Sequence, residues 1–178
     1  MSLLIQYTIL YASVLILVAL GGCFSEHSGV INLGLEGIMV MGALGGALTM
    51  KYLEGSSPVT IVILTIIAAA VTGLVFSALL AVACINFKAD QTIVGTALNM
   101  LGLAAATVIV KAINTAENPD NVSATVQYIA QKKAFLVNIG DFTFNWMMLV
   151  ALVLLIAAYI VLYKTKFGLR LMSCGEHP

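Results

Sequence analysis

The stretch VTIVILTIIAAAVTGLVFSALLAVACI, from Val59 to Ile85, contains no Asp, Glu, Lys, Arg or His. A helix needs about 20 apolar residues to cross the hydrocarbon core of a bilayer, so this run is long enough to span it with some tilt. Lipid offers the backbone no hydrogen-bond partners, and an unbroken apolar run predicts a helix rather than an alternating barrel strand. The stretch therefore predicts a membrane-spanning helix.

The composition of the whole chain agrees with a membrane environment. Hydrophobic residues make up 61% of the 178 residues and charged residues only 9%, whereas about a quarter of the residues in a soluble domain are charged. The net charge is zero and no basic patch occurs, which excludes nucleic-acid binding. Three isolated cysteines show no C-x-x-C spacing, so neither a disulfide framework nor a metal site is expected.

Four further apolar runs resemble the first in length and lack of charge. Together the five predict an all-α integral membrane helical bundle, a single region with about five transmembrane helices. The predicted helices cover residues 3–20, 30–50, 59–85, 92–110 and 144–163. The first run could be taken for a secretory signal peptide, but such peptides begin with positive charge and the first Lys or Arg here is Lys51. We therefore expect it to be retained.

Positive charge predicts the orientation in the cell membrane. Lys164, Lys166 and Arg170 follow the last predicted helix, and Lys and Arg concentrate on the cytoplasmic side. A multi-pass protein with a cytoplasmic C-terminus follows, and five spans place the N-terminus outside. Residues 111–143 then form an extracytoplasmic loop, in which 122–137 are expected to be a short surface helix. This loop is either a passive connector or a docking site for an extracellular partner.

Small residues recur at four-residue spacing in three of the runs, and such stripes let helices pack closely in a bilayer. They predict a tight bundle that pairs with further helices, although such spacing also arises by chance in helices rich in Gly and Ala. The packing positions so predicted are Gly42, Gly46, Gly73, Ser77, Gly95 and Gly102, with Asn99 as a candidate interhelical donor.

Glu36 is the one ionisable residue within a predicted span, and Asn32 precedes it by one turn. An ionisable group at membrane depth suggests a polar pathway, so Asn32, Glu36 and Asn99 are candidate pathway residues. The alternative, which the sequence favours, is that Glu36 lies near a helix N-terminus, where the helix dipole favours negative charge. No catalytic set and no phosphate-binding G-x-x-x-x-G-K-[ST] loop occurs. The sequence predicts neither an enzyme nor a bound cofactor.

Three motifs resemble those of ABC-importer permeases of the branched-chain amino acid and simple-sugar superfamily. They are GGCFSEHSGVINLGLEGIM at 21–39, ADQTIVGTALN at 89–99, and TKFGLRL at 165–171 followed by CGEHP at 174–178. The sequences of these motifs are most similar to those of the nucleoside-type members, which are linked to basic membrane lipoproteins. The resemblance implies a type II importer fold. The family's chains are longer, so it also implies that this sequence corresponds to their N-terminal half.

The resemblance also implies a role and partners. Such a permease works with a separate ATP-binding subunit, a second permease subunit and an extracytoplasmic solute-binding lipoprotein. Residues 164–178 would begin the cytoplasmic coupling loop, with glycines that permit turns. Its expected ATPase-coupling residues are Gly168, Leu169, Arg170, Gly175 and Glu176. The expected function is import of nucleosides or related small polar solutes; the alternatives are sugar or branched-chain amino acid transport, or a non-transporting membrane remnant.

Overall fold

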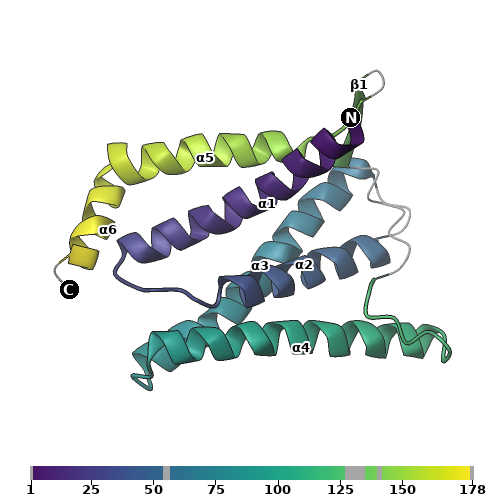
Figure 1. The fold of residues 1–178 in the computed structure, drawn as a ribbon, viewed down its shortest axis with the longest axis horizontal. Coiled ribbons are helices and arrows are strands. Elements are labelled where there is room, and N and C mark those ends of the chain that lie inside the picture. The colour runs from purple at the N-terminus through teal and green to yellow at the C-terminus, as the bar shows by residue number, and fades with distance from the viewer. Residues whose placement is uncertain (1, 54–56, 127–134, 140–141, 177–178) are drawn as a thin grey trace. The chain divides into compact units, whose positions relative to one another are not determined.

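The computed structural model describes residues 2–53, 57–126, 135–139 and 142–176. The chain divides into two units, one formed by residues 1–32 and 135–178 and the other by residues 33–134. Each unit is described by itself. Helices account for most of both, and a short hairpin is added to the first (Figure 1).

The second unit contains the helices α2 (Leu35–Tyr52), α3 (Pro58–Ile85) and α4 (Gln91–Glu117). Local sequence sets where two of them begin. Ser57 caps α3 by accepting a hydrogen bond from the Thr60 amide, and Pro58 follows at the first helical position. The Asp90 carboxylate caps α4 and accepts from the amides of Thr92 and Ile93 at 2.8 and 3.2 Å.

Two small apolar clusters join the three helices of this unit. Leu44 of α2 packs with Ala106 and Val110 of α4, and a second cluster brings α3 against α4. The second cluster consists of Phe76, Leu80 and Leu98. Met41 packs against both clusters, so α2 touches the buried side chains of each of its two neighbours.

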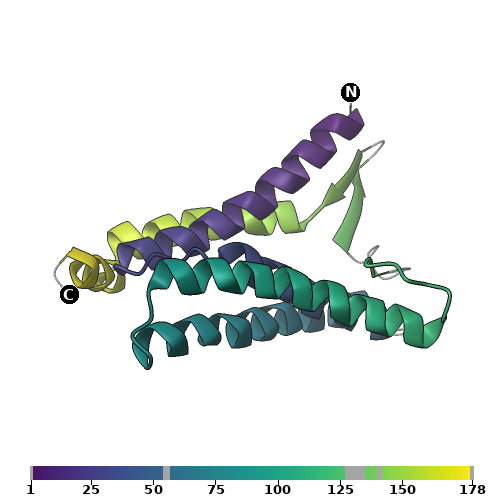
Figure 2. The same cartoon turned by 60° about the horizontal axis from the view of Figure 1, so that its bottom comes forward.

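The first unit contains α1 (Ser2–His27), α5 (Met147–Lys164) and α6 (Lys166–Glu176). The strands β1 (Leu136–Ile139) and β2 (Phe142–Asn145) precede α5 and pair antiparallel, with Leu136 opposite Asn145. Helices α1 and α5 run side by side in the same direction, and α6 turns away from the axis of α5 (Figures 1 and 2). The C-terminal ends of α1 and α5 therefore lie together.

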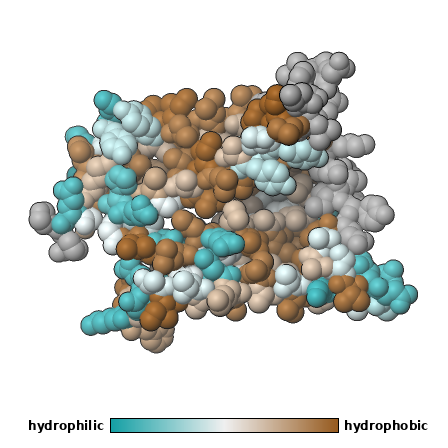
Figure 3. Space-filling view, in the orientation of Figure 1, coloured by the Kyte–Doolittle hydropathy of each residue, from teal (hydrophilic) through white to brown (hydrophobic). Residues whose placement is uncertain are grey.

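Four of the described helices are long and apolar enough to cross a membrane: α1, α3, α4 and α5. Helix α2, which corresponds to the predicted span 30–50, is not among them. It is as long as α5, with 18 residues, but Glu36 and Lys51 near its two ends make it less apolar. Exposed apolar side chains cover the middle of α5, whereas polar ones gather where α5 meets α6 (Figure 3).

The helix ends differ from those predicted from hydropathy. Helix α1 continues to His27 rather than Leu20, and α4 continues to Glu117 rather than Val110. Polar residues end an apolar run, but they do not end backbone hydrogen bonding. Part of the predicted loop 111–143 is therefore helical, and residues 166–176 of the predicted coupling loop form α6.

The short surface helix expected at 122–137 is not present where the structure describes this segment. Residues 122–126 are not helical, and residues 136 and 137 belong to β1. Residues 127–134 lie outside the described residues. The β-branched and aromatic residues on either side of 140–141 favour a hairpin over a helix.

Candidate functional site

The C-terminal end of α1, within the first motif, closes in a tightly bonded cap. The Gly29 amide donates to the Glu26 carbonyl at 3.0 Å, and the Val30 amide donates to the Ser25 carbonyl at 3.2 Å. These two bonds form a Schellman motif, whose reversing residue needs a left-handed backbone. Gly29 fills that position with φ +81°. The Ser25 hydroxyl adds a bond to the Val30 carbonyl at 2.7 Å, which fixes the chain as it leaves the helix.

The corner between α5 and α6 depends on Gly168. A Cβ on this glycine would collide with the Leu162 and Val161 carbonyls at the end of α5. Thr165 occupies the corner: its hydroxyl donates to the Val161 carbonyl at 2.6 Å and accepts from the Gly168 amide at 3.4 Å. Gly168 was expected to permit a turn, but it lies inside α6. It serves instead to let the first turn of α6 lie directly on the last turn of α5.

Gly175, near the other end of α6, lies against the end of α1. A Cβ on Gly175 would be 2.5 Å from the His27 carbonyl oxygen and 2.9 Å from the Gly29 amide nitrogen. The His27 ring makes an edge-on contact with Tyr163 of α5, with centroids 6.1 Å apart. The first and third motifs, far apart in the sequence, therefore meet within this unit. Gly175 also lies inside the helix rather than at a turn.

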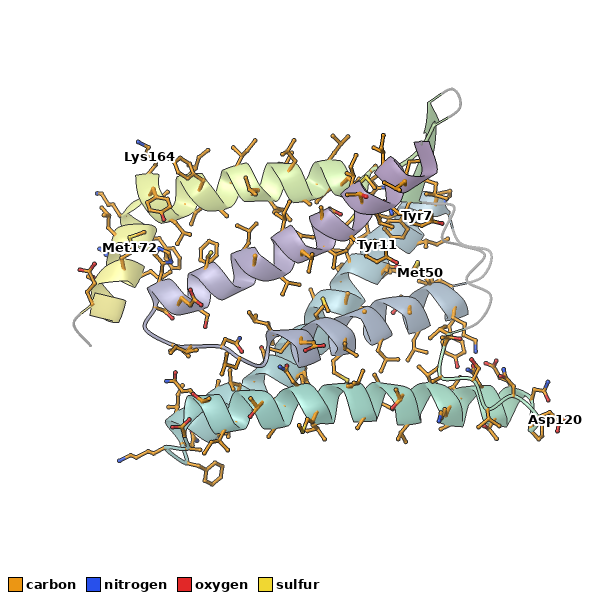
Figure 4. The ribbon with its side chains drawn as sticks, in the orientation of Figure 1. Tyr7, Tyr11, Met50, Asp120, Lys164 and Met172 are labelled. Atoms are coloured by element: carbon orange, nitrogen blue, oxygen red, sulfur yellow. The ribbon has the colours of Figure 1, made fainter. Side chains whose placement is uncertain are left out.

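The five predicted coupling residues fall into two groups. Leu169, Arg170 and Glu176 are exposed on α6. Gly168 and Gly175 instead face α5 and α1 within the same unit. Lys164 projects from the end of α5, and Met172 lies on α6 between the two glycines (Figure 4). The exposed side of α6 can contact a partner, whereas its glycines make internal contacts.

In the second unit, Asn99 of α4 holds the beginning of α2. Its side-chain oxygen accepts from the Gly37 amide and its side-chain nitrogen donates to the Leu33 carbonyl, both at 2.7 Å. The first amides of a helix have no partner within the helix, and the local N-cap, Gly34, supplies no side-chain bond. Asn99 therefore caps α2 from a neighbouring helix, acting as acceptor and donor at once.

The glycines of α4 bring it into backbone contact with α2. A Cβ on Gly102 would be 2.8 Å from the Gly37 Cα, and one on Gly95 would be 3.1 Å from the backbone nitrogen of Gly34, the residue before α2. The residues of α4 that are buried share one face of the helix. They are Gly95, Leu98, Gly102, Ala106, Val110 and Asn114.

Two glycines of α2, Gly42 and Gly46, lie against α3 less tightly, whereas a Cβ on Gly45 would overlap the Thr72 side chain of α3. A Cβ on Gly42 would be 3.2 Å from the Ala69 carbonyl, and one on Gly46 would be 3.4 Å from Thr65 and Ala69. On α3, Gly73 has room for a Cβ, 3.7 Å from Ile38. Ser77, the other predicted packing position of α3, is half-buried, and the residues of this part of the helix that are buried are Phe76 and Leu80.

The candidate pathway residues are divided between the two units. Asn32 belongs to the first unit, and Glu36 and Asn99 belong to the second. Glu36 is exposed in the first turn of α2, where the helix dipole favours a carboxylate. This placement is the one the sequence favoured for Glu36. Among the described residues, no group of three or more His, Cys, Asp or Glu side chains could hold a metal ion.

Two polar contacts of the second unit were not predicted. Asn114 is 2% exposed and donates to the Ser123 and Thr125 carbonyls, both at 2.9 Å. Lys51 at the end of α2 pairs with Glu117 at the end of α4, with 2.6 Å between the charged atoms. Extending the small-residue face of α4 by two turns would have found Asn114. Nothing in the sequence signals the ion pair, because its members are far apart along the chain.

Comparison with known proteins extends the resemblance from three motifs to the chain as a whole. A family described as branched-chain amino acid transport system, permease component, matches residues 4–178. The chain is 37% identical over 187 residues to the guanosine ABC transporter permease protein NupQ of Bacillus subtilis. This alignment covers 100% of the chain and 57% of the relative. It is 34% identical over 184 residues to the nucleoside ABC transporter permease protein NupC of Lactococcus lactis, with the same two coverages. The chain thus spans about half the length of these relatives. No solved structure matches it.

Proposed function

The chain belongs to the family of permease components of branched-chain amino acid transport systems, and from this premise we propose that it acts as the permease subunit of an ATP-driven importer of nucleosides. The observation that carries the proposal is its similarity, along its whole length, to two permeases named for guanosine and nucleosides. Within this role the chain would bind solute in the membrane and catalyse no reaction. ATP would be bound and hydrolysed by a separate subunit.

The exposed side of α6 is the proposed docking surface for that ATP-binding subunit. Leu169 offers an apolar side chain that is 64% exposed, and Arg170 and Glu176 offer charges of both signs. A mixed surface of this kind suits a specific contact, since apolar area contributes affinity and charges set the register. Gly168 and Gly175 pack against α5 and α1 instead, and so hold the helix that carries this surface.

The proposed orientation follows from the parallel course of α1 and α5. Their C-terminal ends lie together with α6, and Lys164, Lys166 and Arg170 are all at this end. Positive charge favours the cytoplasmic side, so α6 would face the cytoplasm and the N-terminus of α1 the outside. The solute-binding lipoprotein would then dock on the opposite side, and a second permease subunit would complete the transporter.

Within the second unit, we place the solute pathway near the start of α2. Glu36 is exposed there and Asn99 fixes the backbone beside it. Asn32 is a third candidate, from its place in the sequence directly before this unit. Nucleosides present hydroxyl and amine groups, which a carboxylate and amides can bind by hydrogen bonds.

Uptake by the assembled transporter tests the proposal. The permease would be reconstituted in proteoliposomes with its ATP-binding subunit and binding lipoprotein and offered labelled guanosine, glucose and leucine. The proposal expects ATP-dependent accumulation of guanosine that excess unlabelled nucleoside removes. Accumulation of leucine alone would favour the amino-acid reading that the family description suggests. Failure to transport any of the three, with the ATP-binding subunit bound, would favour a non-transporting protein.

A further inference from the structure

The contact between Gly175 and the end of α1 is made by backbone atoms on both sides. A Cβ on Gly175 would approach the His27 carbonyl oxygen to 2.5 Å and the Gly29 nitrogen to 2.9 Å, and one on Gly29 would lie 3.1 Å from the Gly175 Cα. Contacts below 3.0 Å are not tolerated unless something moves. Neither backbone can move as a flexible side chain would, so the contact requires glycine at position 175, while a Cβ at position 29 would fit only if its neighbour shifted by a few tenths of an ångström.

The α1 side of this contact is held in place by its own hydrogen bonds. The Schellman bonds from Gly29 and Val30, together with the Ser25 hydroxyl, tie the reversal to the last turn of α1. The His27 ring is held as well, because its Nδ1 lies 2.8 Å from the Cys23 carbonyl and its edge meets Tyr163. A displacement of α6 therefore pushes on the hydrogen-bonded backbone at the end of α1, and not on a flexible side chain.

The opposite side of α6 is exposed, so the helix lies between a free surface and this cap. At Gly168 the other end of α6 packs closely on α5, so the corner between the two helices has little room to move. Beyond Gly29 the chain continues through Val30, Ile31 and Asn32 to the start of α2 at Leu35. A force applied to the exposed face of α6 would reach this connecting segment through Gly175 and Gly29.

From this arrangement we infer that the Gly29–Gly175 contact passes displacements of α6 to the end of α1 and the segment that leads to α2. The inference rests on the proposed function and deepens it. Gly175, expected from sequence to contact the ATP-binding subunit, is instead a positioning residue that acts from inside the permease. Gly29 is its counterpart.

The test compares Gly175→Ala with a control, Ser173→Ala, in the assembled transporter. Alanine is a better helix former than glycine, so a purely local effect at position 175 would be favourable. Ser173 is exposed on the same helix, and its hydroxyl donates to the Arg170 carbonyl at 2.9 Å. Three quantities would be measured: binding of the ATP-binding subunit, ATP hydrolysis with and without the solute-binding lipoprotein, and guanosine uptake per ATP hydrolysed.

For Gly175→Ala we expect subunit binding and basal hydrolysis within about twofold of the unmodified transporter. Uptake per ATP should fall about tenfold or more, and stimulation of hydrolysis by the lipoprotein should be lost. Ser173 lies on the exposed side with Arg170 and Glu176, so Ser173→Ala is allowed to weaken subunit binding, but it should leave uptake per ATP and the stimulation by the lipoprotein unchanged. Normal uptake per ATP in Gly175→Ala would overturn the inference, and so would a selective loss of subunit binding, because Gly175 would then belong to the docking surface.

A second variant, on the other side of the contact, keeps the inference testable if Gly175→Ala does not fold. Gly29→Asn keeps a residue that tolerates positive φ but places a Cβ 3.1 Å from the Gly175 Cα, so we expect the same separation of hydrolysis from uptake, in milder form. Loss of assembly in both variants would overturn the inference by assigning the contact to folding alone. If the unmodified transporter takes up no guanosine, the proposed function is contradicted instead. The stimulation of ATP hydrolysis by the lipoprotein, compared between the unmodified transporter and Gly175→Ala, would still test the Gly29–Gly175 contact.

Discussion

The two units of this chain use glycine in different places. In the second unit, glycines occur along α2 and α4 and bring neighbouring helices together at several levels, from Gly95 and Gly102 to Gly42 and Gly46. In the first unit, the tight glycines gather at one end, around α6, while most of α1 exposes large apolar side chains.

This difference separates two uses of the same residue. In a membrane, close approach of backbones replaces the hydrophobic effect as the force that joins helices, and the second unit uses it along its helices. The first unit reserves close approach for the corner where α5, α6 and the cap of α1 meet. We therefore regard the second unit as a packed bundle and the α6 end of the first as the place where a partner's motion would enter.

The largest expected effect is in the second unit, at Gly102. Valine at this position would force a branched side chain against the Gly37 backbone, where even a Cβ would be 2.8 Å from the Cα. Overpacking typically costs about 1–3 kcal/mol, and a backbone neighbour places Gly102→Val at or above the upper end of that range. Thermal unfolding in detergent measures the loss.

Gly73→Ala is the matched control, since its Cβ would lie 3.7 Å from Ile38. Alanine in a helix should raise stability there by about 0.5–1 kcal/mol. Equal melting temperatures for the two variants would mean that α2 and α4 do not meet at Gly102.

The next largest effect is expected at Asn99. Asn99→Leu removes both the acceptor of the Gly37 amide and the donor to the Leu33 carbonyl, and an unsatisfied buried polar group costs about 1–3 kcal/mol. Hydrogen exchange at the Gly37 amide should accelerate. Thr96 lies one turn earlier and, among the described residues, its hydroxyl donates to carbonyls of its own helix. Thr96→Val should therefore leave that exchange rate unchanged; equal acceleration in both variants would refute the capping role.

A smaller effect is expected at the ion pair between Lys51 and Glu117. Lys51 is 14% exposed, but Glu117 is 51% exposed, and solvent screening limits such pairs to about 1 kcal/mol or less. A double-mutant cycle with Lys51→Met and Glu117→Gln should give a coupling energy in this range that decreases with added salt. A coupling energy that salt does not alter would show that the pair is better shielded than its exposure indicates.

The smallest effect is expected at Thr65, whose buried hydroxyl has no hydrogen-bond partner among the described residues. Thr65→Val replaces it with an apolar group of the same shape, so stability should stay unchanged or rise by up to about 1 kcal/mol. Thr72→Val is the comparison, because the Thr72 hydroxyl donates to the Ala68 carbonyl at 2.8 Å. Greater destabilisation by the Thr65 variant would reveal a partner for that hydroxyl in the membrane.

Helix type and the packed face of α4 could be predicted from the sequence, because both follow from local regularities. Apolar runs set the environment, and Gly95, Gly102 and Ala106 recur at a spacing that places them on one side of a helix. Helix ends were less predictable. The polar residues after Leu20 end the apolar run, yet α1 continues to His27, where Gly29 provides a cap that hydropathy does not register.

The roles of single residues at the α6 end could not be read from spacing. Gly168 and Gly175 suggested turns, because glycine in a polar segment usually marks one. Their contacts with Leu162 and His27 depend on how α5, α6 and α1 come together. Likewise, Lys51 and Glu117 meet only because α2 and α4 run in the same direction within their unit.

Whether α6 faces the cytoplasm and receives the ATP-binding subunit can be tested at Cys174, an exposed residue of that helix. In protein carrying Cys23→Ser and Cys84→Ser, a membrane-impermeant maleimide should label Cys174 in inverted vesicles but not in right-side-out ones. Bound ATP-binding subunit should slow that labelling. Labelling from the outside would contradict the proposed orientation, and an unchanged rate with the subunit bound would contradict docking on α6.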